Sequence, residues 1–151
     1  MRRLAIAAVL AGIGAAATPG SAAAHSLVRS GGGLVSYVSA DATSLNTLVV
    51  RRSGDRVEFR DESVDGGMDP GSCTPGDVDS AGFIVQTFCP LAGVRRLRID
   101  LADREDRATV ALDLPVTLLG GSGADSVAGG AGADEISGCL LYTSPSPRDR
   151  S

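Results

Sequence analysis

Histidine, lysine and aromatic residues are scarce or absent in this chain of 151 residues. The only histidine is His25, no lysine occurs, and the aromatic residues are three Phe and two Tyr. Nucleophilic catalysis by a Ser-His-Asp or Cys-His set needs an interior histidine, and the chain contains neither H-E-x-x-H nor G-x-S-x-G. The visible chain is therefore not expected to be an enzyme.

The charge balance excludes a second class of function. The chain carries 14 basic and 18 acidic side chains, which gives a formal net charge of −4. The two end segments described below hold Arg2, Arg3, Arg148, Arg150 and Asp149, so without them 10 basic and 17 acidic residues remain. An acidic surface with few aromatic residues argues against a nucleic-acid partner and suits a protein that takes up divalent cations.

The first 24 residues are typical of a secretory signal peptide. Two arginines precede an apolar stretch, Pro19 and Gly20 interrupt it, and three alanines at 22–24 offer a cleavage site. A membrane anchor is the alternative, but it needs about 20 unbroken apolar residues. We therefore expect a secreted protein that begins at or near His25 and has no membrane span after cleavage.

The last segment, 139–151, differs in composition from everything before it. Its residues Cys139 to Asp149, CLLYTSPSPRD, resemble the translation of a transposase-type sequencing adapter. The alternative is a genuine Ser/Pro-rich tail. If the adapter interpretation holds, the native protein is longer than this chain.

Three cysteines are present, and one of them, Cys139, lies in that tail. Cys73 and Cys89 remain as an even pair in an exported chain, which predicts a disulfide, with two free thiols as the alternative. A closed loop of about 15 residues contributes roughly 3 kcal/mol. No Cys/His spacing indicates zinc.

A nine-residue unit, G-G-x-G-x-D-x-U-x with U apolar, occurs twice between Gly120 and Gly138. The positions that recur are Gly120, Gly121 and Gly123 as Gly129, Gly130 and Gly132, Asp125 as Asp134, and Val127 as Ile136. A Gly/Ala/Ser linker is the alternative, but a linker has no reason to repeat an acid and an aliphatic residue at an offset of nine. Glycine turns bring carbonyl oxygens together, and carbonyl and carboxylate oxygens are the ligands of Ca²⁺.

These two units resemble the haemolysin-type, or repeats-in-toxin (RTX), calcium-binding family. The resemblance implies that each unit is half a coil of a parallel β-roll, with Ca²⁺ held between turns of neighbouring coils on one edge. It also implies that the repeated glycines with Asp125 and Asp134 form the metal sites. Ala124 and Ala133 stand where the family often has Asn or Asp. Asp125 and Asp134 would lie on opposite edges without intact partners, so weak or absent binding is expected from this chain.

An acidic segment upstream, Asp103 to Arg107, resembles a degraded turn of the same kind. Asp106 precedes Asp125 by 19 residues, one more than a full coil of 18, and could share an ion with it. A solvated charge cluster is the favoured interpretation of this segment.

Period-two alternation without a helical stripe predicts an all-β chain. An irregular β-rich capping region with one disulfide is expected over 25–96, leading into a parallel β-roll over 97–138. The expected strands are 34–38, 48–52, 56–60, 83–88, 97–101, 110–114 and 116–119, with a turn-rich segment at 65–78.

The predicted function is a secreted calcium-binding protein whose repeats fold on Ca²⁺ after export. A truncated exported enzyme or toxin (protease, lipase or cytolysin) is one alternative, and a calcium-rigidified cell-surface spacer is another. A domain after the repeats would favour the enzyme, and retention on the cell would favour the spacer. Protein partners are not predicted.

Overall fold

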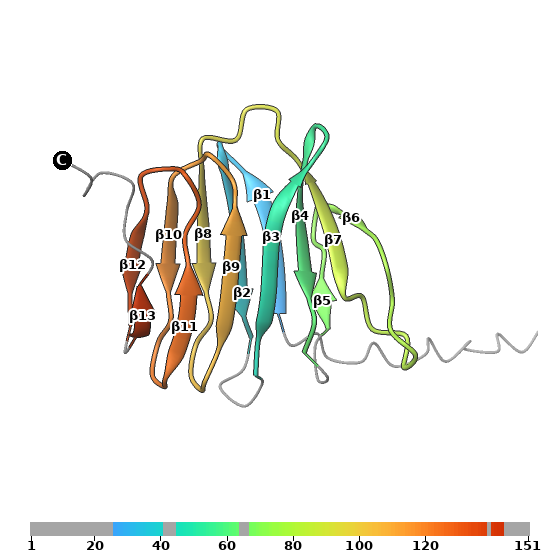
Figure 1. The fold of residues 1–151 in the computed structure, drawn as a ribbon. Coiled ribbons are helices and arrows are strands. Elements are labelled where there is room, and N and C mark those ends of the chain that lie inside the picture. The colour runs from blue at the N-terminus through green and yellow to red at the C-terminus, as the bar shows by residue number, and fades with distance from the viewer. Residues whose placement is uncertain (1–25, 41–44, 64–66, 139, 144–151) are drawn as a thin grey trace, which may run out of the picture.

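A computed structural model describes residues 26–40, 45–63, 67–138 and 140–143, and in these residues every regular element is a β-strand (Figure 1). The expected leader and most of the expected tail lie outside the described residues. The strands are β1 (Ser26–Gly31), β2 (Leu34–Ser39), β3 (Thr47–Ser53), β4 (Arg56–Asp61), β5 (Met68–Asp69), β6 (Thr74–Pro75), β7 (Gln86–Pro90), β8 (Arg96–Asp100), β9 (Arg107–Ala111), β10 (Val116–Leu119), β11 (Asp125–Ala128), β12 (Glu135–Ser137) and β13 (Leu140–Thr143).

The strands form two mixed sheets. One has the order β12-β10-β8-β2-β1-β5 and the other the order β13-β11-β9-β3-β4-β7-β6. The all-β prediction is confirmed. The molecule as a whole is two mixed sheets rather than one parallel roll, because parallel pairing dominates only from β8 onward.

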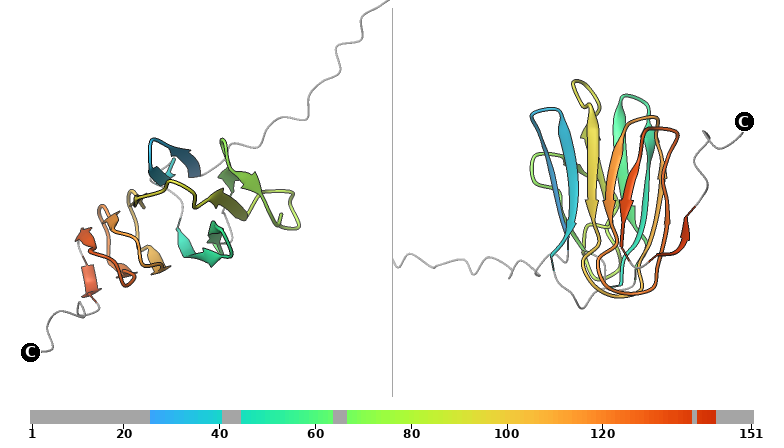
Figure 2. Two further views of the ribbon diagram at one scale, coloured as in Figure 1. Left: turned by 90° about the horizontal axis from the view of Figure 1, so that it is seen from above. Right: turned by 90° about the vertical axis from the view of Figure 1, so that its left-hand side faces the viewer.

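From β8 to β13, successive strands alternate between the two sheets, as Figure 1 shows at its left side. From β10 onward, each strand pairs in parallel with the strand two places before it, whereas β8 and β9 pair in parallel with β2 and β3. Val127 on β11 aligns with Ala108, nineteen positions earlier, whereas Ile136 on β12 aligns with Leu118, eighteen positions earlier. The first complete coil is thus one residue longer than the second. The turns of this half stack in two rows, one along each end of the strands (Figure 2).

The core lies between the sheets because strands such as β2, β8, β9 and β10 alternate buried residues with more exposed ones, which places one face of each sheet inward. In β8, Leu97 and Ile99 are fully buried while the arginines between and before them are exposed. The rings of Tyr37 on β2 and Phe59 on β4 stack across the two sheets with centroids 6.4 Å apart. Val127 is buried and Ile136 is half-buried against the same core, so the apolar position of both repeats points inward.

The first half of the described chain is built from antiparallel hairpins that extend both sheets. β1 pairs with β2, β3 with β4, and β4 with β7. A disulfide joins Cys73, just before β6, to Cys89 on β7, which confirms the predicted pairing. The turn-rich segment at 65–78 contains only the two-residue strands β5 and β6 among its described residues.

Several strand bounds differ from expectation. The segment 110–114 was expected to be a strand, but β9 ends at Ala111 and the chain turns before Pro115, because proline cannot donate to a sheet ladder. The strand expected over 83–88 begins only at Gln86. β1 was not predicted, because the glycines after it obscured its short alternation.

Part of the expected tail continues the stacking. β13 pairs in parallel with β11, but Asp125 aligns with Leu140 and Val127 with Thr143, and the register shifts between Asp125 and Ser126. The strand arrives earlier than an eighteen-residue coil would place it, because no third glycine-rich turn precedes it.

Candidate metal centre

Two turns lie next to each other at the lower end of the strands in Figure 1: 101–106, between β8 and β9, and 120–124, between β10 and β11. Their backbones follow the same path at an offset of 19. Ala102 and Gly121 both have positive φ, 67° and 81°, and Arg104 and Gly123 have φ of 105° and 135°. The segment 101–106 is therefore a copy of the repeat turn in which ordinary residues replace the glycines.

The two turns are in direct backbone contact. The N–H of Arg104 donates to the carbonyl of Ser122 at 2.7 Å, Asp103 and Ser122 form a parallel bridge, and the Ser122 hydroxyl donates to the Asp103 carboxylate. A Cβ on Gly121 would lie 1.4 Å from the carbonyl oxygen of Ala102, and one on Gly123 would lie 1.8 Å from that of Arg104. The glycines are required because carbonyl oxygens of the first turn occupy the space of a side chain.

Asp106 and the repeat residue Asp125 form a column along this edge. Asp125 Oδ1 accepts the backbone N–H of Asp106 at 3.0 Å, and Asp106 Oδ1 accepts the backbone N–H of Asn46 at 2.7 Å. Each carboxylate thus bonds the residue aligned with it on the preceding coil. Asp106 is 2% exposed and Asp125 is fully buried. The interpretation of Asp106 as part of a solvated cluster is wrong, because the extra residue in the first coil brings Asp106 into alignment with Asp125.

The second oxygen of each of these carboxylates is the unusual feature of the site. Asp106 Oδ2 and Asp125 Oδ2 are buried without a hydrogen-bond partner among the described residues. Burial raises the pKa of Asp106 above its usual value, and the charge of Asp125 adds to the rise, although hydrogen bonds from Asn46 oppose it. Two buried carboxylates that repel each other, each with one oxygen that has no donor among the described residues, are costly unless a positive charge joins them.

The donor set here suits a hard cation. Both carboxylates supply oxygen, and the carbonyl oxygens of Ala102 and Arg104 lie between the turns. Among the described residues, no group of three or more His, Cys, Asp and Glu could hold a metal. A cation at this edge would therefore take most of its ligands from main-chain carbonyls, a mode common for Ca²⁺ and unsuited to Zn²⁺.

The second repeat turn lies at the opposite end of the strands. Asp134 Oδ1 accepts the N–H of Val116 at 3.1 Å, so this carboxylate aligns with an aliphatic residue rather than with another acid. Burial raises the pKa of Asp134. A Cβ on Gly130 or Gly132 would lie 2.0 or 2.2 Å from carbonyl oxygens of the preceding turn. This edge therefore repeats the close approach of glycines to carbonyl oxygens, with one carboxylate and without the positive φ of Gly121 and Gly123.

The first glycine of each repeat has its own role. A Cβ on Gly120 would lie 2.4 Å from Asp125 Oδ2, and one on Gly129 would lie 2.3 Å from Asp134 Oδ2. Glycine at this position leaves room for the carboxylate of the same repeat. The structure thus brings Asp106 together with Gly120, Gly121, Gly123 and Asp125, and places Gly129, Gly130, Gly132 and Asp134 on the other edge.

Sequence reasoning missed Asn46. Its side chain is 2% exposed, and its Nδ2 donates to Asp106 Oδ1 at 3.1 Å in addition to the main-chain bond. It precedes Asp106 by sixty residues, and no repeat spacing connects the two. The only signal is its place immediately before a strand, which corresponds to the place of Asp106 before β9.

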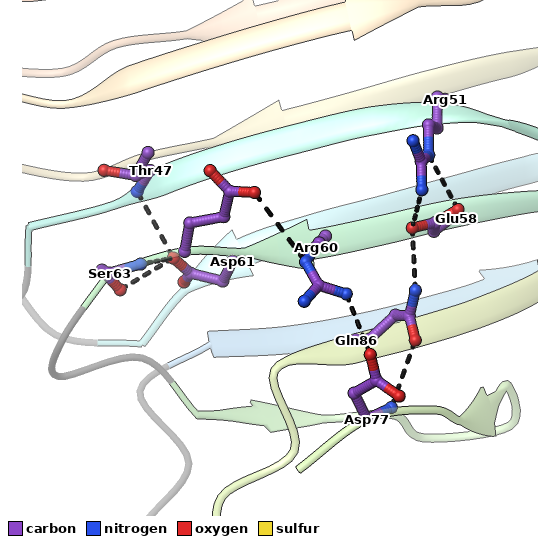
Figure 3. Close-up of polar contacts among 9 residues, drawn as sticks. Thr47, Arg51, Glu58, Arg60, Asp61, Ser63, Asp77 and Gln86 are labelled. Carbon is purple, nitrogen blue, oxygen red and sulfur yellow. Dashed lines mark hydrogen bonds and ion pairs between the residues drawn. The ribbon is translucent and has the colours of Figure 1, made fainter. Parts of the chain in front are cut away.

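Other buried carboxylates have ordinary partners. In Figure 3, Glu58 on β4 accepts two hydrogen bonds from Arg51 at 2.9 Å each and one from Gln86 at 2.8 Å. Asp61 Oδ1 accepts from the N–H and hydroxyl of Ser63 and from the N–H of Thr47, and its Oδ2 accepts from the Tyr37 hydroxyl at 3.0 Å. Both groups are satisfied by protein donors, so neither needs a cation.

In the part of the chain that the structure describes, no helix is long and apolar enough to cross a membrane. The chain matches no protein-family model, no curated protein and no solved structure with which it was compared.

Proposed function

We propose that this chain is a secreted calcium-binding protein of the RTX kind, whose second half, from β8 onward, is the start of a parallel β-roll. The proposal is supported by the nonapeptide spacing and by parallel strands that alternate between two sheets. Inward Val127 and Ile136 agree with it as well.

One observation carries the calcium assignment. Asp106 and Asp125 stack on adjacent coils, and each has a buried Oδ2 without a donor among the described residues. A divalent cation would neutralise both charges and satisfy both oxygens. Because the carbonyl oxygens of Ala102 and Arg104 would complete an all-oxygen set that is adaptable in number, Ca²⁺ fits better than Mg²⁺, which demands near-ideal octahedral geometry.

The same arrangement couples binding to folding. Without a cation, the acidic turns repel each other and the strands of the roll lose their register at this edge. Extracellular calcium would remove that repulsion, so binding free energy becomes folding free energy. We therefore propose that the coils fold outside the cell. Affinity is expected in the range of extracellular modules, with Kd about 10⁻⁴–10⁻³ M, because one pair of carboxylates is complete.

Calorimetric titration of the chelator-treated chain with CaCl₂ tests this function. Wild type should bind, and Asp106→Asn and Asp125→Asn should each weaken binding at least about tenfold, because each removes one of two ligand charges. Asp55→Asn is the matched control, since the Asp55 side chain is 96% exposed in the hairpin turn after β3, at the opposite end of that strand from Asn46.

Absence of binding heat from the wild-type chain at about 10 mM CaCl₂, well above the expected Kd, would contradict the proposal. Equal affinities of wild type and both aspartate variants would show that any bound calcium lies elsewhere.

A further inference from the structure

The carboxylate column does not continue toward β3 with another acidic residue. The residue aligned with Asp106 on the preceding strand pair is Asn46, just before β3, as Thr47 aligns with Arg107. Asn46 has a neutral side chain of nearly the same shape as aspartate. The column therefore consists of Asn46, Asp106 and Asp125 on three successive levels.

The contacts on the two sides of Asp106 are opposite in kind. Toward Asn46, Asp106 Oδ1 accepts two hydrogen bonds, from the main-chain N–H at 2.7 Å and from Nδ2 at 3.1 Å. Its other oxygen, Oδ2, has no donor among the described residues. On the far side, Asp106 offers its own N–H to Asp125. One oxygen is thus occupied by protein donors and the other is left free.

The orientation of the Asn46 side chain is determined by its other partners. The carbonyl oxygen of Leu101 can only accept and lies 3.1 Å from Asn46 Nδ2, so it fixes which end of the amide carries hydrogen. The Tyr37 hydroxyl lies 3.0 Å from Oδ1, and the Ser39 hydroxyl makes a longer contact of 3.4 Å with Nδ2. These partners come from β2 and from the end of β8, all of them buried. The amide therefore presents hydrogen, not oxygen, to Asp106.

We propose that Asn46 is the positioning residue of the calcium site and the residue that ends the column. This inference rests on the proposed function. Asn46 holds Asp106 Oδ1 with two donors and so directs Oδ2 to the cation. Because hydrogen atoms line the gap between Asn46 and Asp106, that gap is closed to a cation, and an ion bound by the column would take Asp106 Oδ2 as its first carboxylate oxygen.

Calorimetric titration of the whole chain with CaCl₂ tests the positioning role. Asn46→Ala should weaken calcium affinity about tenfold to a hundredfold, as the loss of an outer partner does at other metal sites, and should leave stoichiometry unchanged. Asn46→Ser, whose hydroxyl is too short to replace the amide, should behave in the same way and serves if the alanine variant does not fold. Folding of each calcium-free variant is monitored by thermal unfolding.

Ser39→Ala is the matched control. It removes the weakest acceptor of the Asn46 amide and leaves both hydrogens for Leu101 and Asp106, so its affinity should stay within about twofold of wild type. A second control, Cys73→Ser with Cys89→Ser, destabilises the hairpin half without touching the column, and it separates affinity from stability.

The outcomes distinguish the two proposals. Wild type that binds while both folded Asn46 variants retain affinity within about twofold would overturn the positioning role and leave the calcium function standing. Equal losses in the Asn46 variants and the disulfide variant would also overturn it, because the effect would then follow stability alone. Wild type that fails to bind would overturn the calcium function itself. A second calcium ion in wild type that disappears in Asn46→Ala would contradict the inference that Asn46 closes its gap.

Discussion

The repeat glycines act through the space they leave for neighbouring oxygen atoms. Gly121 has a positive φ of 81°, and a carbonyl oxygen lies where its Cβ would be. A side chain at this position would therefore be disfavoured by both the backbone conformation and the contact. Gly120 and Gly129 show only the second cost, toward a carboxylate of their own repeat. The glycines of the motif are therefore required by close backbone contacts between coils as well as by the turn conformation.

Substitution of Gly121 by alanine tests that view. Because the new Cβ would lie 1.4 Å from the Ala102 carbonyl oxygen, the two turns must separate, and we expect a loss of about 3 kcal/mol or more in the free energy of unfolding. Urea denaturation measures it. Gly31→Ala is the control, since no atom lies within 4 Å of the position that its new methyl group would take and its φ is not positive. Similar losses in both variants would contradict the contact.

At the scale of the element, the turn between β8 and β9 has the backbone of a repeat without its glycines. Arg104 is exposed and has φ of 105°, a conformation that costs a non-glycine residue about 1–3 kcal/mol. The turn persists because strands β8 and β9 align with β10 and β11 on either side of it. Strand pairing thus imposes the conformation on a sequence that disfavours it.

Arg104→Gly should therefore stabilise the chain by about 1 kcal/mol, after the entropy cost of glycine is subtracted. Arg107→Gly, which removes an exposed side chain from a regular strand position three residues later, should have the opposite sign. Thermal unfolding of the two variants side by side checks the prediction. Destabilisation by both would show that Arg104 is not strained.

At the scale of the whole molecule, resistance to acid depends on a buried carboxylate away from the column of Asp106 and Asp125. The hydrogen bonds from Arg51 hold the pKa of Glu58 below its usual value of 4.5, against the opposing effect of burial, and a bond from Gln86 assists. The contacts of Glu58 with Arg51 and Gln86 join β3, β4 and β7 across the sheet (Figure 3). Because the folded pKa is lowered, the stabilisation is complete above the usual pKa and is lost as the pH falls through the lowered one.

We expect the free energy of unfolding of wild type to fall between about pH 5 and pH 3 more steeply than that of Glu58→Gln, whose side chain does not titrate. The slope is compared rather than the absolute value, since the variant also loses an ion pair. Glu62→Gln, an exposed partner of Arg60, is the control and should keep the wild-type slope. Parallel slopes for wild type and Glu58→Gln would contradict the prediction.

Much of this architecture was predictable from local pattern. Alternation predicted the strands at 56–60 and 97–101, because one face of each must be buried and the other solvated. The recurrence of Val127 as Ile136 was visible in the nine-residue period, and the disulfide followed from an even cysteine count. These features depend on neighbouring residues or on a short repeat, and both can be identified in a single sequence.

The rest was decided by contacts between distant segments. Asp106 stands in an acidic stretch that is typical of a solvated loop, and only its alignment under Asn46 and over Asp125 makes it a buried member of a column. Asn46 itself carries no signal in the sequence beyond its place before a strand. The sequence does not show where in the first coil the one extra residue is accommodated. The pairing of β8 and β9 with their neighbouring strands determines its position. Sequence by itself determined the repeating unit, whereas the tertiary structure decided which carboxylates meet, because stacking joins residues that no local pattern connects.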